Sequence, residues 1–123
     1  MYILSVETGF SAAHSLRDFP GKCSETHGHN WKVKVDIKCH KLDNFGMVMD
    51  FDELTEIVNE IVKKLDHKNL NEIDPFSFTN PTSENIARYI YSEVAENLPN
   101  YISVKSVQVW ESDTTSVIYS EEY

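Results

Sequence analysis

The strictest pattern in this sequence is the alternation of apolar and polar residues across positions 31–40. The apolar series is Trp31, Val33, Val35, Ile37 and Cys39, and the residues between and after them are Lys32, Lys34, Asp36, Lys38 and His40. Successive side chains of a strand point to opposite faces, so the segment predicts a strand with one buried and one solvated face. The chain must therefore build a sheet that is covered on one side.

Two other segments carry helical periodicity. Residues 51–65 place apolar side chains three and four positions apart, directly after Asp50, which predicts a helix capped by that residue. A second helix should follow Pro81, with Thr82 or Ser83 as its cap. The apolar stripe of this second helix consists of Ile86, Ile90 and Val94.

Strands are also expected over residues 2–14, 102–111 and 115–121. The order strand–strand–helix–helix–strand–strand, with short turns between paired strands, predicts an α+β fold. We expect a four-stranded antiparallel sheet with two helices on one face. No linker, repeat or low-complexity segment divides the chain, so residues 1–123 should form a single domain.

Composition narrows the environment and the partners. The net charge of −9 argues against nucleic-acid binding, and no apolar run approaches the length that spans a bilayer. The N-terminal residues lack the features of a secretory signal peptide. The two cysteines have no framework spacing, which is typical of the cytoplasm. We expect a cytoplasmic protein without membrane partners.

Three histidines should meet at one end of the predicted sheet. His27 and His29 precede the alternating segment and keep its apolar parity, and His14 ends the first strand on its apolar face. The loop 15–26 joins these strands into a hairpin, so the three side chains should converge. Three imidazoles with one open position form the catalytic type of zinc site, although they would also suit iron or nickel. The competing interpretation is three unrelated histidines near a turn.

Two cysteines and a fourth histidine receive separate interpretations. Cys23 lies four positions before His27, where it would either close the metal site as a ligand or act in catalysis. Cys39 lies on the apolar face of its strand and is expected in the core. His40 lies on the charged face and is expected in solvent.

Five motifs, in order along the chain, resemble those of the 6-pyruvoyl-tetrahydropterin synthase family. They are AAH at 12–14, CSETHGHN at 23–30, LDHKNLN at 65–71, NPTSEN at 80–85 and VWES at 109–112. The resemblance covers nearly the whole chain. It implies the tunnelling fold, assembled as a homohexamer of two trimers with active sites between subunits.

The short gap between Cys23 and His27 is similar to that of one branch of the family, 6-carboxytetrahydropterin synthase. This resemblance implies a zinc-dependent lyase of the queuosine and deazapurine route. Its substrate would be 7,8-dihydroneopterin triphosphate, and its products 6-carboxy-5,6,7,8-tetrahydropterin, acetaldehyde and triphosphate.

The resemblance also implies roles for single residues. The zinc ligands would be His14, His27 and His29. Cys23 would abstract a proton, assisted by Asp66 and His67, often from a neighbouring subunit. Asp66 would alternatively act on Cys23 directly or bind the main chain. His67 would alternatively be a histidine favoured at a helix C-terminus.

Glu111 is the implied anchor of the pterin ring. It shares the parity of Val107 and Val109, so its carboxylate ends an apolar face and needs donors, which a pterin amine and ring N–H supply as a bidentate pair. The competing interpretation is a strand-end glutamate in solvent. Thr82, Ser83 and Glu84 match a segment near the pterin, although they also suit a helix cap. Arg17 and Lys22 are candidate contacts of the triphosphate.

Other functions stay open at this level. Glu25 lies in the same loop as Cys23 and is similar to a residue of relatives that cleave the pterin side chain as an aldolase, for folate synthesis. The pyruvoyl synthase reaction is a third outcome. A non-catalytic zinc module that binds a pterin would need neither Cys23 nor the Asp66–His67 pair.

Overall fold

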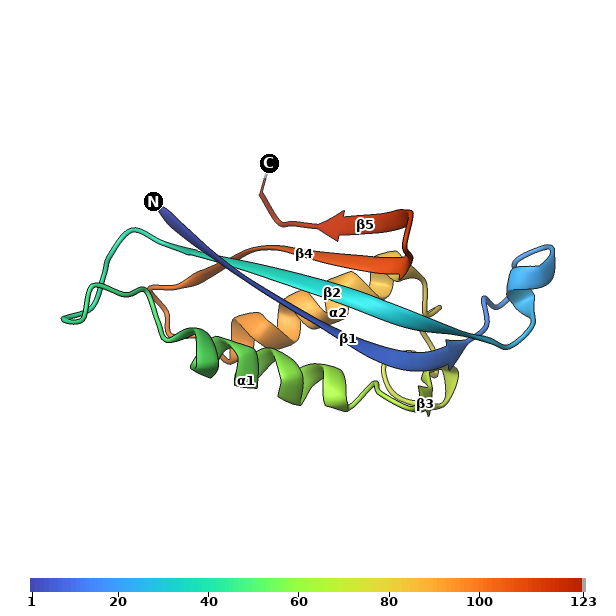
Figure 1. Cartoon of the computed structure of the whole chain (residues 1–123). Helices are drawn as coiled ribbons and strands as arrows, with labels where there is room; N and C mark the ends of the chain where they lie inside the picture. Colours follow the sequence, from blue (N-terminus) through green and yellow to red (C-terminus); the bar gives the residue numbers. More distant parts are fainter. Residues whose placement is uncertain (123) are drawn as a thin grey trace.

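The computed structural model describes residues 1–122 as a twisted sheet with two helices packed on one face (Figure 1). The helices are α1 (Phe51–Lys63) and α2 (Ser83–Glu96), and the strands are β1 (Tyr2–His14), β2 (His27–Cys39), β3 (Lys68–Asn69), β4 (Ser103–Ser112) and β5 (Thr115–Tyr119). The strand order in the sheet is β3-β1-β2-β4-β5. The predicted α+β class, with two helices on one face, is confirmed.

The predicted strand count of four is wrong, because the sheet has five strands. The additional strand, β3, has two residues and pairs with β1 in parallel, whereas the other neighbouring strands are antiparallel. A strand this short carries no readable alternation, so the sequence pattern could not reveal it.

The core lies between the sheet and the two helices. The alternating apolar residues of β2 face the helices, and Val33, Val35 and Ile37 are fully buried. Leu54 of α1 and Ile86 of α2 oppose them and are equally buried. Cys39 is buried as expected, and His40 is exposed as expected.

Both predicted helix caps are confirmed. The Asp50 side chain accepts a hydrogen bond from the Asp52 main-chain N–H, and Thr82 accepts one from Asn85. α1 ends at Lys63, two residues before the predicted end. No helix within residues 1–122 is both long and apolar enough to cross a bilayer.

The β1–β2 hairpin positions the histidines. Its register runs from Tyr2 opposite Cys39 to His14 opposite His27. β2 therefore begins at His27, four positions before the alternating segment, and the strand parity extends back through His29. The loop 15–26 projects beyond the end of the sheet (Figure 1).

Candidate metal centre and active site

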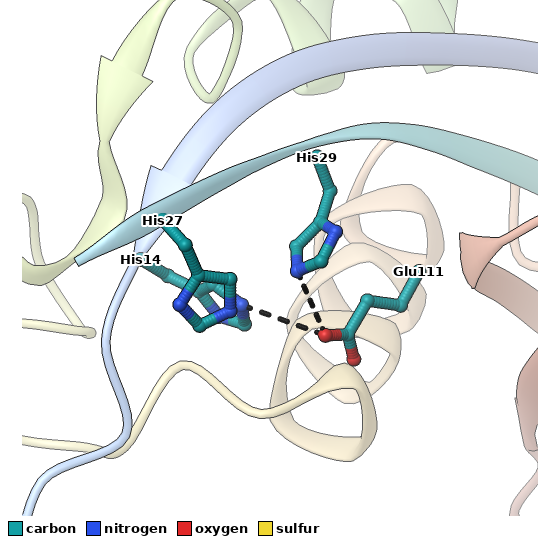
Figure 2. Close-up of side chains that lie close together, drawn as sticks. All are labelled: His14, His27, His29 and Glu111. Carbon is teal, nitrogen blue, oxygen red and sulfur yellow. Dashed lines mark ion pairs between the residues drawn. The ribbon is translucent and has the colours of Figure 1, made fainter. Parts of the chain in front are cut away.

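Three histidines converge at the end of the β1–β2 hairpin, on the face that the helices cover (Figure 2). His14 lies opposite His27 across the hairpin, and His29 lies opposite Ala12. The ring centroids are 4.7 Å apart for His14 and His27, 4.8 Å for His27 and His29, and 5.3 Å for His14 and His29. The predicted convergence is therefore present in the structure.

Main-chain carbonyls orient two of these rings. The Nδ1 of His14 lies 2.7 Å from the Pro81 carbonyl oxygen, and the Nδ1 of His27 lies 2.7 Å from the Glu25 carbonyl oxygen. A carbonyl only accepts, so each Nδ1 carries the proton and donates it. The Nε2 lone pair of each neutral ring is thereby left for a ligand, as in metal-binding histidines.

The environment of His14 favours a neutral imidazole. Its side chain is 1% exposed, and burial lowers the pKa of His14 below its usual value, against the opposing effects of the Pro81 carbonyl and the Glu111 charge. The Nε2 atoms of His14 and His29 are both buried and lack a hydrogen-bond partner within residues 1–122. Buried polar atoms are rarely left unsatisfied unless they serve a ligand.

Glu111, near the end of β4, joins the cluster. Its Oε1 lies 2.9 Å from His29 Nε2 and 3.8 Å from His14 Nε2, close enough for ion pairing but without the alignment of a hydrogen bond. Its Oε2 accepts a hydrogen bond from Ser83 Oγ at 3.1 Å. One ligand atom from each of the four residues lies within 4.8 Å of the others. Three imidazoles and a carboxylate form a donor set that suits zinc or a related ion.

Trp31 forms the wall behind two of the histidines. It is 2% exposed, and its ring centroid lies 4.9 Å from that of His14 and 5.3 Å from that of His29. Its indole N–H donates to the Ala12 carbonyl at 3.2 Å. The indole therefore keeps one side of the cluster rigid and dry.

Cys23 lies outside this cluster, in a short 3₁₀ turn (Lys22–Ser24) of the 15–26 loop. Its thiol is free and exposed. Its carbonyl accepts a hydrogen bond from the Leu16 N–H at 2.8 Å, which ties the two arms of the loop together. The candidate ligand set consists of the histidines and Glu111, so the structure does not favour Cys23 as a closing ligand.

The Asp66–His67 pair is held firmly against β1. Asp66 Oδ1 accepts a hydrogen bond from the Ser11 N–H at 2.9 Å, and the His67 N–H donates to the Ser11 carbonyl at 2.6 Å. The Ser11 bond is the main cause that lowers the pKa of Asp66, and His67 adds to it. Asp66 Oδ2 lies 3.0 Å from His67 Nδ1, so the carboxylate orients the imidazole.

The imidazole of His67 faces solvent. Its side chain is 83% exposed, and its main chain has a left-handed φ of 58°. No hydrogen bond or ion pair within residues 1–122 joins this pair to Cys23. One chain therefore presents both parts of the predicted proton-transfer group without bringing them into contact.

The remaining predicted contacts divide. Thr82 caps α2, and Ser83 donates to Glu111. Glu84 lies in the first turn of α2, and no hydrogen bond or ion pair within residues 1–122 joins it to the cluster. Arg17 donates to main-chain carbonyls of the 71–79 segment, which does not favour its predicted role as a triphosphate contact. That role stays a prediction for Lys22.

Pro81, Asn71 and Asn80 were not predicted at all. They support the site through a main-chain carbonyl and two side-chain amides. The sequence shows these residues only as members of the motifs LDHKNLN and NPTSEN, and asparagines between two helices are also what an ordinary turn contains.

The protein is thus an α+β fold in which helices cover a mostly antiparallel sheet, with a candidate metal centre of three imidazoles and a carboxylate at one end. A sequence model described as 6-pyruvoyl tetrahydropterin synthase matches residues 3–122, and the chain belongs to that family. The resemblance inferred from the motifs is thus confirmed, and with it the assignment as a lyase of the pterin synthase family.

Individual relatives agree with the family assignment. The chain is 48% identical to a putative 6-carboxy-5,6,7,8-tetrahydropterin synthase of Archaeoglobus fulgidus, covering 90% of this chain and 89% of that one. It is 37% identical to a dihydroneopterin monophosphate aldolase of Pyrococcus furiosus, covering 88% of each. The structure of a Caenorhabditis elegans 6-pyruvoyl tetrahydropterin synthase aligns with a TM-score of 0.83 and 28% identity, covering 99% of this chain and 98% of that one. The tunnelling fold is thereby confirmed.

Proposed function

We propose that this chain is a zinc-dependent 6-carboxytetrahydropterin synthase. It would convert 7,8-dihydroneopterin triphosphate to 6-carboxy-5,6,7,8-tetrahydropterin, acetaldehyde and triphosphate, as a cytoplasmic single-domain enzyme of the queuosine and deazapurine route. The observation that carries this proposal is the convergence of three imidazoles, two of them oriented by main-chain carbonyls, on Glu111, at the base of the loop that holds Cys23. The 48% identity to a relative named for this reaction supports the choice of branch.

His14, His27 and His29 would hold the zinc through Nε2, because the Nδ1 atoms of His14 and His27 are committed to carbonyls. A bound zinc would supply Lewis acidity toward oxygen atoms of the substrate side chain. Trp31 and the histidines themselves would exclude bulk water from one side of that group. His14, the most buried of the three, would enter coordination without first losing a proton.

Cys23 would act as the base that takes a proton from the substrate side chain. Its thiol is exposed and lies in the loop that precedes His27, so a substrate bound at the histidines would lie beside this loop. A cysteine that forms no disulfide within residues 1–122 suits this role, since a thiolate is the reactive form. Replacing Cys23 with Ala should abolish turnover while leaving metal binding intact.

Asp66 and His67 would carry the proton onward, from a neighbouring subunit. The carboxylate orients the imidazole at 3.0 Å, and the imidazole faces outward, so a second chain is needed to bring it to a thiol. We propose a homohexamer of two trimers, with active sites at subunit interfaces. Mixing Cys23→Ala and His67→Ala chains tests this arrangement, because mixed assemblies should regain activity at interfaces that receive both intact residues.

Glu111 would anchor the pterin ring, with Ser83 and Thr82 beside it. Ser83 already fixes Oε2, so the carboxylate is held in place before substrate binds. The contact of Oε1 with His29 offers a second role, as a metal ligand. The substitution Glu111→Gln separates the two roles: an anchor loses pterin affinity and keeps cobalt affinity, whereas a ligand loses cobalt affinity as well.

Side-chain cleavage of the aldolase type is the second candidate. Glu25 stands two positions after Cys23, and the Pyrococcus furiosus relative is named for that chemistry. The Glu25 carbonyl also accepts a hydrogen bond from His27, which holds the main chain of Glu25 next to the site. A carboxylate there would serve as the acid–base group in place of the thiol.

The deciding experiment incubates metal-loaded protein with 7,8-dihydroneopterin triphosphate and identifies the products by mass spectrometry. We expect carboxytetrahydropterin and acetaldehyde. Hydroxymethyldihydropterin would assign the aldolase reaction, and a pyruvoyl product the third branch. Tight pterin binding without any turnover would instead identify a non-catalytic pterin-binding module.

A further inference from the structure

The strand that carries His14 is held along its outer edge by a row of hydrogen bonds from the segment 66–82. Asp66 and His67 bind both main-chain groups of Ser11, and β3 then pairs with Ala12 and Ala13. Beyond the end of β1, the side chains of Asn71 and Asn80 continue this row in place of a strand. The segment 66–82 thus follows the edge of β1 past the metal centre.

Each asparagine binds both main-chain groups of one residue. The Asn71 amide accepts from the Ser15 N–H at 2.8 Å and donates to the Ser15 carbonyl at 3.0 Å. The Asn80 amide accepts from the Arg17 N–H at 2.8 Å and donates to the Arg17 carbonyl at 3.4 Å. A side-chain amide reproduces the donor and acceptor of a peptide unit, so these contacts imitate strand pairing.

The side chain of Arg17 also binds the 71–79 segment. Its guanidinium donates to the carbonyls of Phe76 at 2.5 Å and Asn71 at 3.2 Å, with a longer contact to Thr79 at 3.5 Å. Three carbonyls of one irregular segment are thus gathered around one planar cation. A guanidinium has five N–H donors in a fixed plane, whereas a lysine ammonium is a compact charge that cannot span three separated acceptors.

The chain directly after the segment that Arg17 binds supplies two contacts to the metal centre. The Pro81 carbonyl, directly after Asn80, fixes the Nδ1 proton and ring orientation of His14. Ser83, two residues further on, holds the Glu111 carboxylate. The Asn80 carbonyl also accepts from the Thr82 N–H at 2.8 Å and the Asn85 amide at 2.9 Å, which connects this segment to the start of α2.

We propose that Arg17 is a positioning residue for the metal centre, acting through the 71–80 segment on the Pro81 carbonyl and hence on His14. This inference rests on the proposed function, because it presumes that the histidines bind a metal ion. Within residues 1–122, no hydrogen bond or ion pair joins Arg17 to the histidines or to Glu111. Its loss would free the segment, release His14 from a single orientation, and weaken metal binding although all ligands remain.

Cobalt binding tests this inference without any catalytic assay. Trp31 contacts His14 and His29, so quenching of its fluorescence reports occupancy of the site by cobalt. The experiment uses a Trp110→Phe background, which removes the other tryptophan, beneath Lys32. Cobalt d–d absorption reports the coordination geometry. The test variant is Arg17→Lys, which keeps the charge. The matched control is Lys22→Ala, which removes an exposed cation of the same loop.

Loss of an outer partner of a metal-binding histidine costs roughly ten- to a hundredfold in affinity. We therefore expect Arg17→Lys to weaken cobalt binding by about tenfold or more and to alter the d–d spectrum, and Lys22→Ala to match the wild type. Asn80→Ala opens the same segment from its other side and should show the same loss. It replaces Arg17→Lys in the test if that variant does not fold.

The outcomes separate the possible failures. If Arg17→Lys binds cobalt as tightly as the wild type, the positioning role alone is overturned. The same holds for Asn80→Ala where that variant replaces Arg17→Lys. Unchanged cobalt affinity in Arg17→Ala, with a raised KM that Arg17→Lys restores, would also overturn it and assign Arg17 to the triphosphate. Absence of cobalt binding in the wild type would overturn the proposed metal centre, and this inference with it.

Discussion

Removal of the proposed metal ion should leave the protein folded but measurably less stable. The core between the sheet and the helices consists of apolar side chains, and among the cluster residues only His14 is fully buried. A chain of 123 residues with a core of this kind does not need a metal ion to fold, unlike small zinc modules that unfold when the metal is withdrawn. The chelated protein should therefore show a cooperative thermal transition.

The size of the effect follows from linkage. An ion that binds only the folded state adds about 2.7 kcal/mol of stability when its free concentration is one hundred times Kd. For a domain of this length, one kcal/mol moves Tm by roughly 3–5 °C, so the transition should rise by roughly 8–14 °C. Circular dichroism of the chelated protein, with zinc added in steps, measures both transitions.

Two variants serve as controls for this measurement. His27→Ala and His29→Ala each remove one ligand from the half-exposed side of the cluster and leave the apolar core unchanged. Both should fold, and both should lose most of the shift at the same zinc concentration. An unfolded chelated protein would refute the reasoning about the core. A zinc-induced shift in both variants as large as that of the wild type would refute the assignment of the ligands.

Three further predictions concern stability. Asp66→Asn should lower the urea midpoint at pH 7, because the pKa of Asp66 is lowered in the folded state. The difference in urea midpoint between this variant and the wild type should shrink and then vanish as the pH falls below about 4, where the carboxylate becomes protonated. Burial and then Glu93 raise the pKa of Tyr89 to about 12, so wild-type stability should decline from about pH 10 to about pH 12, and less so in Tyr89→Phe. Leu54→Ala empties a fully buried position of α1 and should cost roughly 2–5 kcal/mol by urea denaturation, whereas a cost below about 1 kcal/mol would contradict the packing described.

Strand parity explains why the convergence of the three histidines could be predicted from the sequence. The period of a strand is two, so an alternating segment at 31–40 also assigns faces to positions 27 and 29. A hairpin with its loop over 15–26 then sets residue 14 opposite residue 27, which is the observed register. Parity also assigned Glu111 to the apolar face of β4.

The segment 66–82 shows where that reasoning ends. It is held by asparagine amides, an arginine and main-chain carbonyls, and these contacts leave no periodic apolar pattern. His14 is oriented by the main-chain carbonyl of Pro81, and a residue of any type has such a carbonyl. Such contacts depend on three-dimensional placement, so sequence patterns could neither reveal β3 nor anticipate the role of Arg17.

The geometry of His67 offers the strongest physical argument for an assembly. A non-glycine residue with a left-handed main chain carries a conformational cost of roughly 1–3 kcal/mol, and it persists only where its surroundings enforce it. Here Ser11 and Asp66 enforce it, and the result is an oriented imidazole that remains 83% exposed. Within residues 1–122, no hydrogen bond or ion pair joins the His67 imidazole to Cys23 or to the cluster of histidines and Glu111. A neighbouring chain that brings its own Cys23 to this imidazole would give the strain a function, which is why we place the proposed proton transfer between subunits.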